Sequence, residues 1–183
     1  MRFTAVFLLV LMLAACENDL REVKRLTKKD TLPLQTAKTV TMLYYDSAAL
    51  KIKLTAPRID EYAGSDPYTE MKEGMKVEFY DENMNVNSSI TAKYAIRRER
   101  TNMMEARNNV VVVNTKGERL ETEQLFWDER GDSLYTSKKV KVTSGTQIIH
   151  SEGLWADQTF NVYRFYKVTG IFALPDSEEE EKK

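Results

Sequence analysis

The stretch that decides the fold class is residues 50–56, Leu50-Lys51-Ile52-Lys53-Leu54-Thr55-Ala56, in which apolar and polar side chains alternate. The same period of two recurs at residues 75–79 (Met-Lys-Val-Glu-Phe) and 90–96 (Ile-Thr-Ala-Lys-Tyr-Ala-Ile). Because successive side chains of a strand point to opposite faces, each stretch predicts a strand with one apolar face. The four valines at 110–113 add β-branched residues, which favour a strand over a helix.

Turn-forming residues separate these runs, and no stretch after residue 40 carries a long apolar stripe at helical spacing. The runs also repeat every 28 to 30 residues, with Val110, Val140 and Val168 at equivalent positions. Each repeat reads as a pair of strands that cannot cover its own apolar face, so consecutive pairs are expected to stack. The sequence therefore predicts an all-β domain with opposed apolar faces, as in a sandwich, a jelly roll or a slot.

The composition excludes several classes of protein. The 183 residues include 27 basic and 28 acidic ones, and the formal net charge of -1 argues against the broad basic surface of a nucleic-acid-binding protein. A single histidine excludes a His-rich zinc site, and no phosphate-binding glycine motif occurs, so no metal or cofactor is expected. The length suits one domain of ordinary size.

The first sixteen residues have the pattern of a targeting signal. Arg2 precedes an apolar run over residues 3–13, which is too short to span a bilayer as a permanent helix. Leu13-Ala14-Ala15-Cys16 follows directly and resembles the lipobox of bacterial lipoproteins. We expect residues 1–15 to be a lipoprotein signal peptide and Cys16, the only cysteine, to carry a membrane-anchoring lipid. The alternative is a plain signal peptide followed by a buried cysteine.

The rest of the chain divides into three parts. Residues 16–38 are polar and mixed in charge, and we expect them to form a membrane-proximal tether. Residues 39–175 contain the alternating runs and form the predicted β domain. Residues 176–183 include four consecutive glutamates and are expected to be an acidic disordered tail.

An ordered series of segments resembles the LptC/LptA/OstA-like family of lipopolysaccharide transport proteins, and within it the LptC family in a lipoprotein variant. The segments are Thr91-Ala92-Lys93-Tyr94, residues 104–112 (Met-Glu-Ala-Arg-Asn-Asn-Val-Val-Val), residues 120–128 (Leu-Glu-Thr-Glu-Gln-Leu-Phe-Trp-Asp), residues 134–142 (Leu-Tyr-Thr-Ser-Lys-Lys-Val-Lys-Val) and Gly153-Leu154-Trp155-Ala156-Asp157. Residues 50–79 are similar to the opening strands of LptC. The sequence departs from the family pattern at Ala106 and Asn108, where many members have Gly-Asn, and in its lipobox, where the best-studied members keep a transmembrane helix.

The resemblance implies a twisted, partly open antiparallel β-jellyroll of the LptA/LptC type. In this family, a groove between the two sheets receives the acyl chains of lipopolysaccharide from an inner-membrane ABC transporter. The lipid then passes to a like-folded periplasmic bridge protein. The implied location is the cell envelope, with the chain lipid-anchored to a membrane and facing the periplasm, and the inner membrane fits the family role best.

The alternation indicates which apolar side chains would line such a groove and bind acyl chains. They are Ile52, Leu54, Val77, Phe79, Ala92, Tyr94, Met104, Leu120, Leu125, Val140, Val142 and Leu154. The alternative is that the same residues fill a closed core, in a structural or scaffold envelope lipoprotein that binds only proteins. A continuous slot would favour the carrier, and a fully packed interior would favour the scaffold.

The edges of an open jelly roll expose unpaired backbone groups, which suit strand pairing with like-folded partners. We expect residues 162–172 to pair with the bridge protein and residues 40–54 to face the transporter.

Two groups of polar residues remain. Arg97, Arg98, Arg100 and Arg107 either meet lipid phosphates at the groove mouth or form a solvated hairpin tip, and we favour the hairpin tip. His150 and Ser151 are adjacent on an alternating strand, so their side chains point to opposite faces and are badly placed to act as base and nucleophile. The chain is therefore not expected to be an enzyme.

Overall fold

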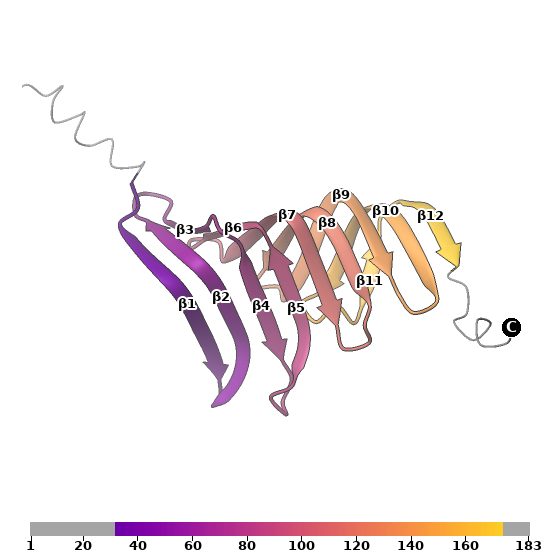
Figure 1. The fold of residues 1–183 in the computed structure, drawn as a ribbon, viewed down its shortest axis with the longest axis horizontal. Coiled ribbons are helices and arrows are strands. Elements are labelled where there is room, and N and C mark those ends of the chain that lie inside the picture. The colour runs from indigo at the N-terminus through magenta and orange to yellow at the C-terminus, as the bar shows by residue number, and fades with distance from the viewer. Residues whose placement is uncertain (1–31, 174–183) are drawn as a thin grey trace, which may run out of the picture. The chain divides into compact units, whose positions relative to one another are not determined.

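The computed structural model describes residues 32–173, and every regular element in this range is a strand (Figure 1). The strands are β1 (Gln35–Asp46), β2 (Ala49–Tyr62), β3 (Tyr68–Met71), β4 (Met75–Tyr80), β5 (Val86–Ala92), β6 (Tyr94–Arg98), β7 (Met103–Asn114), β8 (Arg119–Asp128), β9 (Ser133–Thr143), β10 (Gln147–Asp157), β11 (Tyr163–Phe165) and β12 (Val168–Ala173). Within the described range no helix could cross a membrane. The predicted signal peptide, Cys16, the first part of the tether and the tail at 176–183 lie outside the described residues.

The sheet is an antiparallel meander folded in half along its length. One side of β2 pairs with β1, while its other side pairs first with β4, through 52–55, and then with β3, through 60–62. In the same way, β7 pairs first with β6, through 103–107, and then with β5, through 111–114, and β10 pairs first with β12 and then with β11. The pairs β3/β4, β5/β6 and β11/β12 therefore each act as one long strand interrupted at a bend.

The bends divide the sheet into two facing layers. We call the half that contains β4, β5 and β12 layer 1, and the half that contains β3, β6 and β11 layer 2. The ladders β7–β8, β8–β9 and β9–β10 all change register at the boundary between the layers. Left-handed backbone is found there at Thr39, Gly74, Asn108, Asn109 and Gly153, a conformation that glycine and asparagine adopt most readily.

The apolar core lies between the layers. In layer 1, Val112, Leu120 and Val142 are direct cross-strand neighbours and almost fully buried. In layer 2, Met104, Trp127 and Leu134 form an equivalent row. These opposed layers are the twisted, partly open antiparallel β-jellyroll expected from the sequence, and the fold class is confirmed.

A loop closes the open side of the sandwich at the β10 end. We call residues 158–162, between β10 and β11, the strap. The backbone N–H of Gln158 donates to the Asp132 carbonyl at the tip of layer 2 (2.9 Å), and the Gln158 carbonyl accepts from Ser88 Oγ at the tip of layer 1 (3.0 Å). Asn114 Nδ2 donates to the Phe160 carbonyl (2.8 Å), and the Phe160 side chain is fully buried. The strap therefore joins the free ends of the two layers and fills the space between them.

Candidate functional site: a groove at the β1 end

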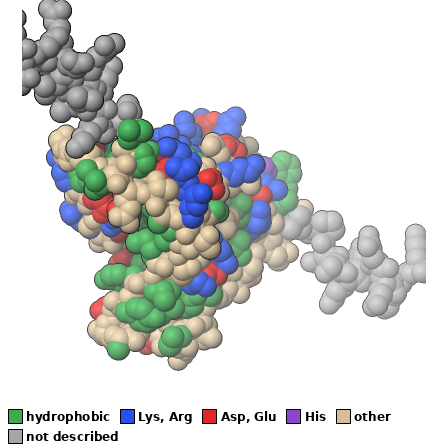
Figure 2. Space-filling model, turned by 60° about the vertical axis from the view of Figure 1, so that its left-hand side comes forward, with side chains coloured by type: hydrophobic (Ala, Val, Ile, Leu, Met, Phe, Trp, Pro, Cys, Tyr) green, Lys and Arg blue, Asp and Glu red, His purple; other side chains and the backbone are tan. Residues whose placement is uncertain are grey.

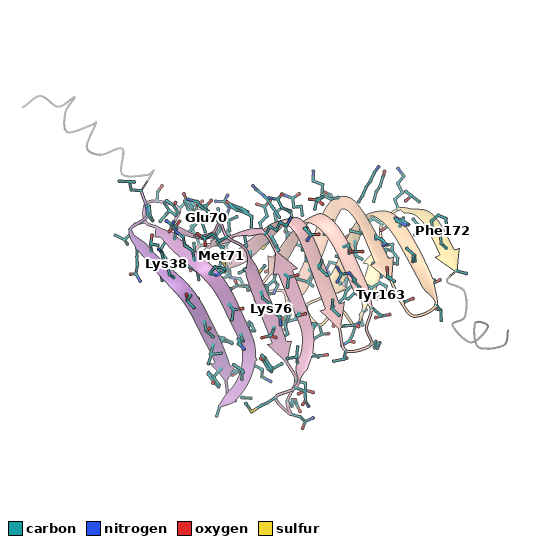
Figure 3. The ribbon with its side chains drawn as sticks, in the orientation of Figure 1. Lys38, Glu70, Met71, Lys76, Tyr163 and Phe172 are labelled. Carbon is teal, nitrogen blue, oxygen red and sulfur yellow. The ribbon has the colours of Figure 1, made fainter. Side chains whose placement is uncertain are left out.

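Away from the strap, the space between the layers stays open as a cavity of about 840 Å³. Its lining is mostly apolar: Leu34, Ala37, Val40, Met42, Leu43, Tyr44, Ile52, Leu54, Ile59, Tyr62, Ala63, Pro67, Tyr68, Met71, Met104 and Trp127. The polar lining residues are Gln35, Glu61, Thr69, Arg97, Glu99 and Glu129. We call this cavity the groove. In Figure 3, Met71, which lies in its lining, is at the β1 end of the sandwich, and Phe172 is at the opposite end.

The groove opens to solvent because β1 is an edge strand. Val40, Met42 and Tyr44 continue the apolar inner face of β2, yet Met42 and Tyr44 are 56% and 60% exposed. Leu43, opposite Lys53, and Tyr45, which a register shift after Tyr44 places opposite Leu50, are also exposed, so apolar side chains are exposed along this whole end of the β1–β2 hairpin. Figure 2, which turns the β1 side forward, shows hydrophobic side chains gathered on the lower part of this face. An apolar patch of this kind marks an interaction site.

The structure separates the twelve predicted groove residues into three groups. Ile52, Leu54 and Met104 line the groove. Tyr94 is half-buried, donates its hydroxyl to Glu70 (2.7 Å) and has Arg107 over its ring, and burial together with Glu70 raises its pKa to about 12. The other eight are buried in the core: Val77, Phe79, Ala92, Leu120, Leu125, Val140, Val142 and Leu154.

Sequence reasoning missed the lining residues that β1 supplies. Val40, Met42 and Tyr44 do alternate, but the apolar Leu43 and Tyr45 between and after them hide the pattern. Trp127 is a second lining residue that the alternation does not identify. Its signal was its position seven residues after Leu120 on a strand that changes register at 122–126, because such a shift alters which face a side chain occupies.

One row of the groove is polar. Gln35, Glu61, Thr69 and Arg97 are direct cross-strand neighbours from β1 to β6, and Met104 and Trp127 continue the row. Arg97 donates Nε and Nη2 to the two carboxylate oxygens of Glu129 (2.6 and 2.8 Å), which raises the pKa of the guanidinium. Glu99 accepts from Arg97 Nη1.

The other arginines of the predicted basic cluster are also matched by carboxylates. Arg98 and Arg100 lie 3.1 and 3.6 Å from Asp66, and Arg107 lies 2.6 Å from Glu105. The four arginines are therefore ion-paired and form no free basic patch, and of the four only Arg97 lines the groove.

His150 and Ser151 do not come together. Ser151 is buried and donates its hydroxyl to the Gly153 carbonyl (3.1 Å), whereas the His150 ring packs edge-on against Phe172 (5.8 Å between ring centroids). Residues 32–173 contain no group of three or more histidine, cysteine or acidic side chains placed to hold a metal.

The opposite edge of the sheet is also exposed and apolar. Val168, Ile171 and Phe172 of β12 are 48%, 61% and 58% exposed. Ile171 lies opposite Ile149, whose other neighbour is the buried Val142, so the apolar inner face of layer 1 reaches this edge as well. The sheet thus ends in two exposed apolar strands, β1 and β12.

A family model described as "Lipopolysaccharide-assembly, LptC-related" matches residues 3–172, which include every strand up to the penultimate residue of β12. No curated protein matches the chain.

Proposed function

Since the chain belongs to the LptC-related family of lipopolysaccharide-assembly proteins, we propose that it takes up lipopolysaccharide from an inner-membrane ABC transporter and passes it to a like-folded periplasmic bridge protein. The family is one of envelope transport proteins and not of enzymes. The observation that carries the proposal is the apolar groove of about 840 Å³, which lies between the layers and opens at β1.

The groove suits acyl chains because its apolar lining removes methylenes from water. Each buried methylene contributes about 0.8 kcal/mol, so part of one chain is held by several kcal/mol without polar contacts. Met42, Met71 and Met104 supply flexible side chains that adapt to chains of different length. The exposed inner face of β1 gives a chain an entry route that needs no opening of the core.

A photoreactive residue in the groove tests this proposal. Ile52 lines the groove, whereas Lys53 is the next residue, on the opposite face of β2, where it lies 3.5 Å from Glu78. We expect lipopolysaccharide adducts in cells from a photoreactive residue at Ile52 and none from one at Lys53. Equal labelling at the two positions, or none at either, would count against a carrier function.

The two exposed edges are the proposed partner sites. We infer that β1 pairs with the transporter and β12 with the bridge protein, because each edge strand offers free backbone groups beside exposed apolar side chains. Photoreactive residues at Leu43 and Phe172 are expected to label different proteins. Labelling of the transporter from Phe172 alone would reverse the orientation.

The proposed anchor is a lipid on Cys16, with the chain on the periplasmic side of the inner membrane. Cys16→Ala is expected to move the protein from the membrane fraction to the soluble periplasm, because a single covalent lipid site supplies the attachment. An unchanged membrane fraction would contradict lipidation at this residue.

A scaffold function remains the second candidate, and the packing around the strap favours it. Phe160 fills the interior there and stacks on Tyr163 with ring centroids 4.9 Å apart. If the whole interior stays closed in cells, the protein binds only other proteins. The adduct at Ile52 separates the two candidates, since a scaffold gives none.

A further inference from the structure

The groove contains a buried hydrogen-bond donor with no acceptor. Trp127 lines the groove and is only 5% exposed, and its Nε1–H has no hydrogen-bond partner among residues 32–173. A buried donor without a partner is rare in folded proteins and costs roughly 1–3 kcal/mol. Such a group is explained if its partner arrives with a ligand.

The packing around Trp127 fixes its ring and offers no substitute acceptor. Phe79 reaches across from layer 1 and meets the indole edge-to-face, with ring centroids 5.0 Å apart and an interplanar angle of 86°. On its own layer, the cross-strand neighbours of Trp127 are Met104 and Leu134, both almost fully buried. These three neighbours are apolar, so the indole N–H is held within an apolar wall.

The position of Trp127 is the point where the lining changes from polar to apolar. The row Thr69, Arg97, Met104, Trp127 crosses from the polar rim into the apolar interior. The rim carries Arg97 together with the carboxylates Glu99 and Glu129, so its net charge does not attract an anion. A neutral oxygen at the head of an apolar chain matches both the change from polar to apolar lining and a rim that does not attract an anion.

We propose that Trp127 Nε1–H donates a hydrogen bond to the carbonyl oxygen of an ester- or amide-linked acyl chain as the chain enters the groove. This inference rests on the proposed function and names the part of the lipid that the groove recognises. It makes Trp127 a specificity-determining residue, because the N–H distinguishes an acyl chain from an ether-linked chain of the same length. It also sets how deep the chain can enter.

The test compares two probes that differ only in this oxygen. The full chain is titrated with a single-chain lipid whose chain is ester-linked and with its ether-linked counterpart of the same length and head group. We expect the parent protein to bind the ester probe about three- to tenfold more tightly, the range for one hydrogen bond. Trp127→Phe keeps an aromatic ring against Phe79 and is expected to bind both probes equally.

Trp155→Phe is the matched control, because Trp155 is the other tryptophan of the chain, pairs with Tyr135 and Arg164 and is not part of the groove. It should keep the preference for the ester probe. A preference that survives in Trp127→Phe, or that is missing in the parent, overturns the inference.

The Trp155→Phe variant also gives a measurement that needs no change at Trp127. It leaves a single indole N–H, whose NMR signal is expected to move downfield when the ester probe binds and to stay nearly unchanged with the ether probe. An indole signal that ignores the ester probe overturns the inference even though the probe binds. If neither probe binds, the proposed function fails as well. Binding without the ester preference overturns only the role of Trp127, so the failure of this inference can be told apart from the failure of the proposed function.

Discussion

At the scale of single residues, the fold depends on a few positions with left-handed backbone. Gly74 has φ +92 and Gly153 has φ +87, and both lie where a strand crosses from one layer to the other. Asn108 and Asn109 play the same part in β7, and Asn108 is one of the two positions at which the sequence departs from the Gly-Asn of the family pattern. Residues 151–153 (Ser-Glu-Gly) are of turn-forming types, but β10 bends there without reversing. Turn residues permit left-handed backbone, and the pairing of the neighbouring strands decides whether the chain reverses or only bends.

Gly74→Ala is expected to lower the free energy of unfolding by about 2–4 kcal/mol. An added Cβ would lie 2.8 Å from the Ala92 carbonyl oxygen, and the backbone angle is already unfavourable for alanine. The Ala92 oxygen belongs to the main chain of β5, so the contact cannot be relieved by a side-chain rotation. Chemical denaturation of the purified chain measures the change.

Two other glycines separate the effect of the angle from the effect of the contact. Gly117 has φ +77 but no atom within 4 Å of an added Cβ, so Gly117→Ala should cost only about 1 kcal/mol. Gly145 has neither feature, and Gly145→Ala should leave stability nearly unchanged. Equal stability of all three variants would show that close approach at the bend does not constrain the fold.

At the scale of elements, β1 depends on contacts that its own sequence does not reveal. It begins at Gln35, inside the range expected to be a tether. That expectation arose because residues 35–38 (Gln-Thr-Ala-Lys) are mostly polar and lack a clear apolar alternation. The buried carboxylate of Asp60 on β2 holds this segment: it accepts from Thr36 Oγ1 (2.7 Å) and Arg58 Nε (2.9 Å), and Lys72 lies 3.6 Å away. One buried charge on the neighbouring strand can therefore hold a polar strand in the sheet.

Asp60→Asn should destabilise the protein at neutral pH, and the difference from the parent should vanish in acid. The hydrogen bond from Thr36, with that from Arg58, lowers the pKa of the Asp60 carboxyl below its ordinary value of 3.8. A lowered pKa in the folded state means that the charge stabilises the fold above about pH 4 and that this contribution is lost as the pH falls through the folded-state pKa. Thermal unfolding between pH 7 and pH 2.5 measures the difference in Tm.

Asp66→Asn is the control for this titration. Asp66 is 44% exposed and pairs with Arg98 and Arg100 at the surface, where such pairs contribute little. Its Tm should follow that of the parent at every pH. If the Tm of Asp60→Asn also follows that of the parent at every pH, the buried carboxylate does not hold β1 in place.

At the scale of the whole molecule, alternation in the sequence was sufficient for the all-β class and for most inward residues. Val77, Leu120 and Val142 were expected on the inner face and are buried. Alternation does not predict how the meander folds into two layers or where the strap runs, because both depend on contacts between residues far apart in the sequence. Phe160 illustrates this: it lies in the short segment Gln-Thr-Phe-Asn between two strands, yet its side chain is fully buried.

The strap sets a condition on any transport along the molecule. The strap joins Ser88 and Asn114 of layer 1 to the end of β10 and inserts the fully buried Phe160 side chain between the layers, so we expect it to obstruct an acyl chain that moves from the β1 end toward β12. Phe160 also has φ +55, an unfavourable angle for a bulky residue. We therefore expect passage of an acyl chain to require that the Phe160 side chain leave the interior.

Phe160→Ala should accordingly extend lipid contact toward β12. With a photoreactive residue at Ile149, near that edge, we expect more lipopolysaccharide adduct in Phe160→Ala than in the parent, although the variant loses about 3–5 kcal/mol of stability. Leu154→Ala is the control, since Leu154 is equally buried and its truncation destabilises the core while leaving the strap across the opening. An increase in both variants would reflect general loosening of the core. An increase in Phe160→Ala alone makes the strap the barrier between the two ends, because only that variant removes the side chain that the strap inserts between the layers.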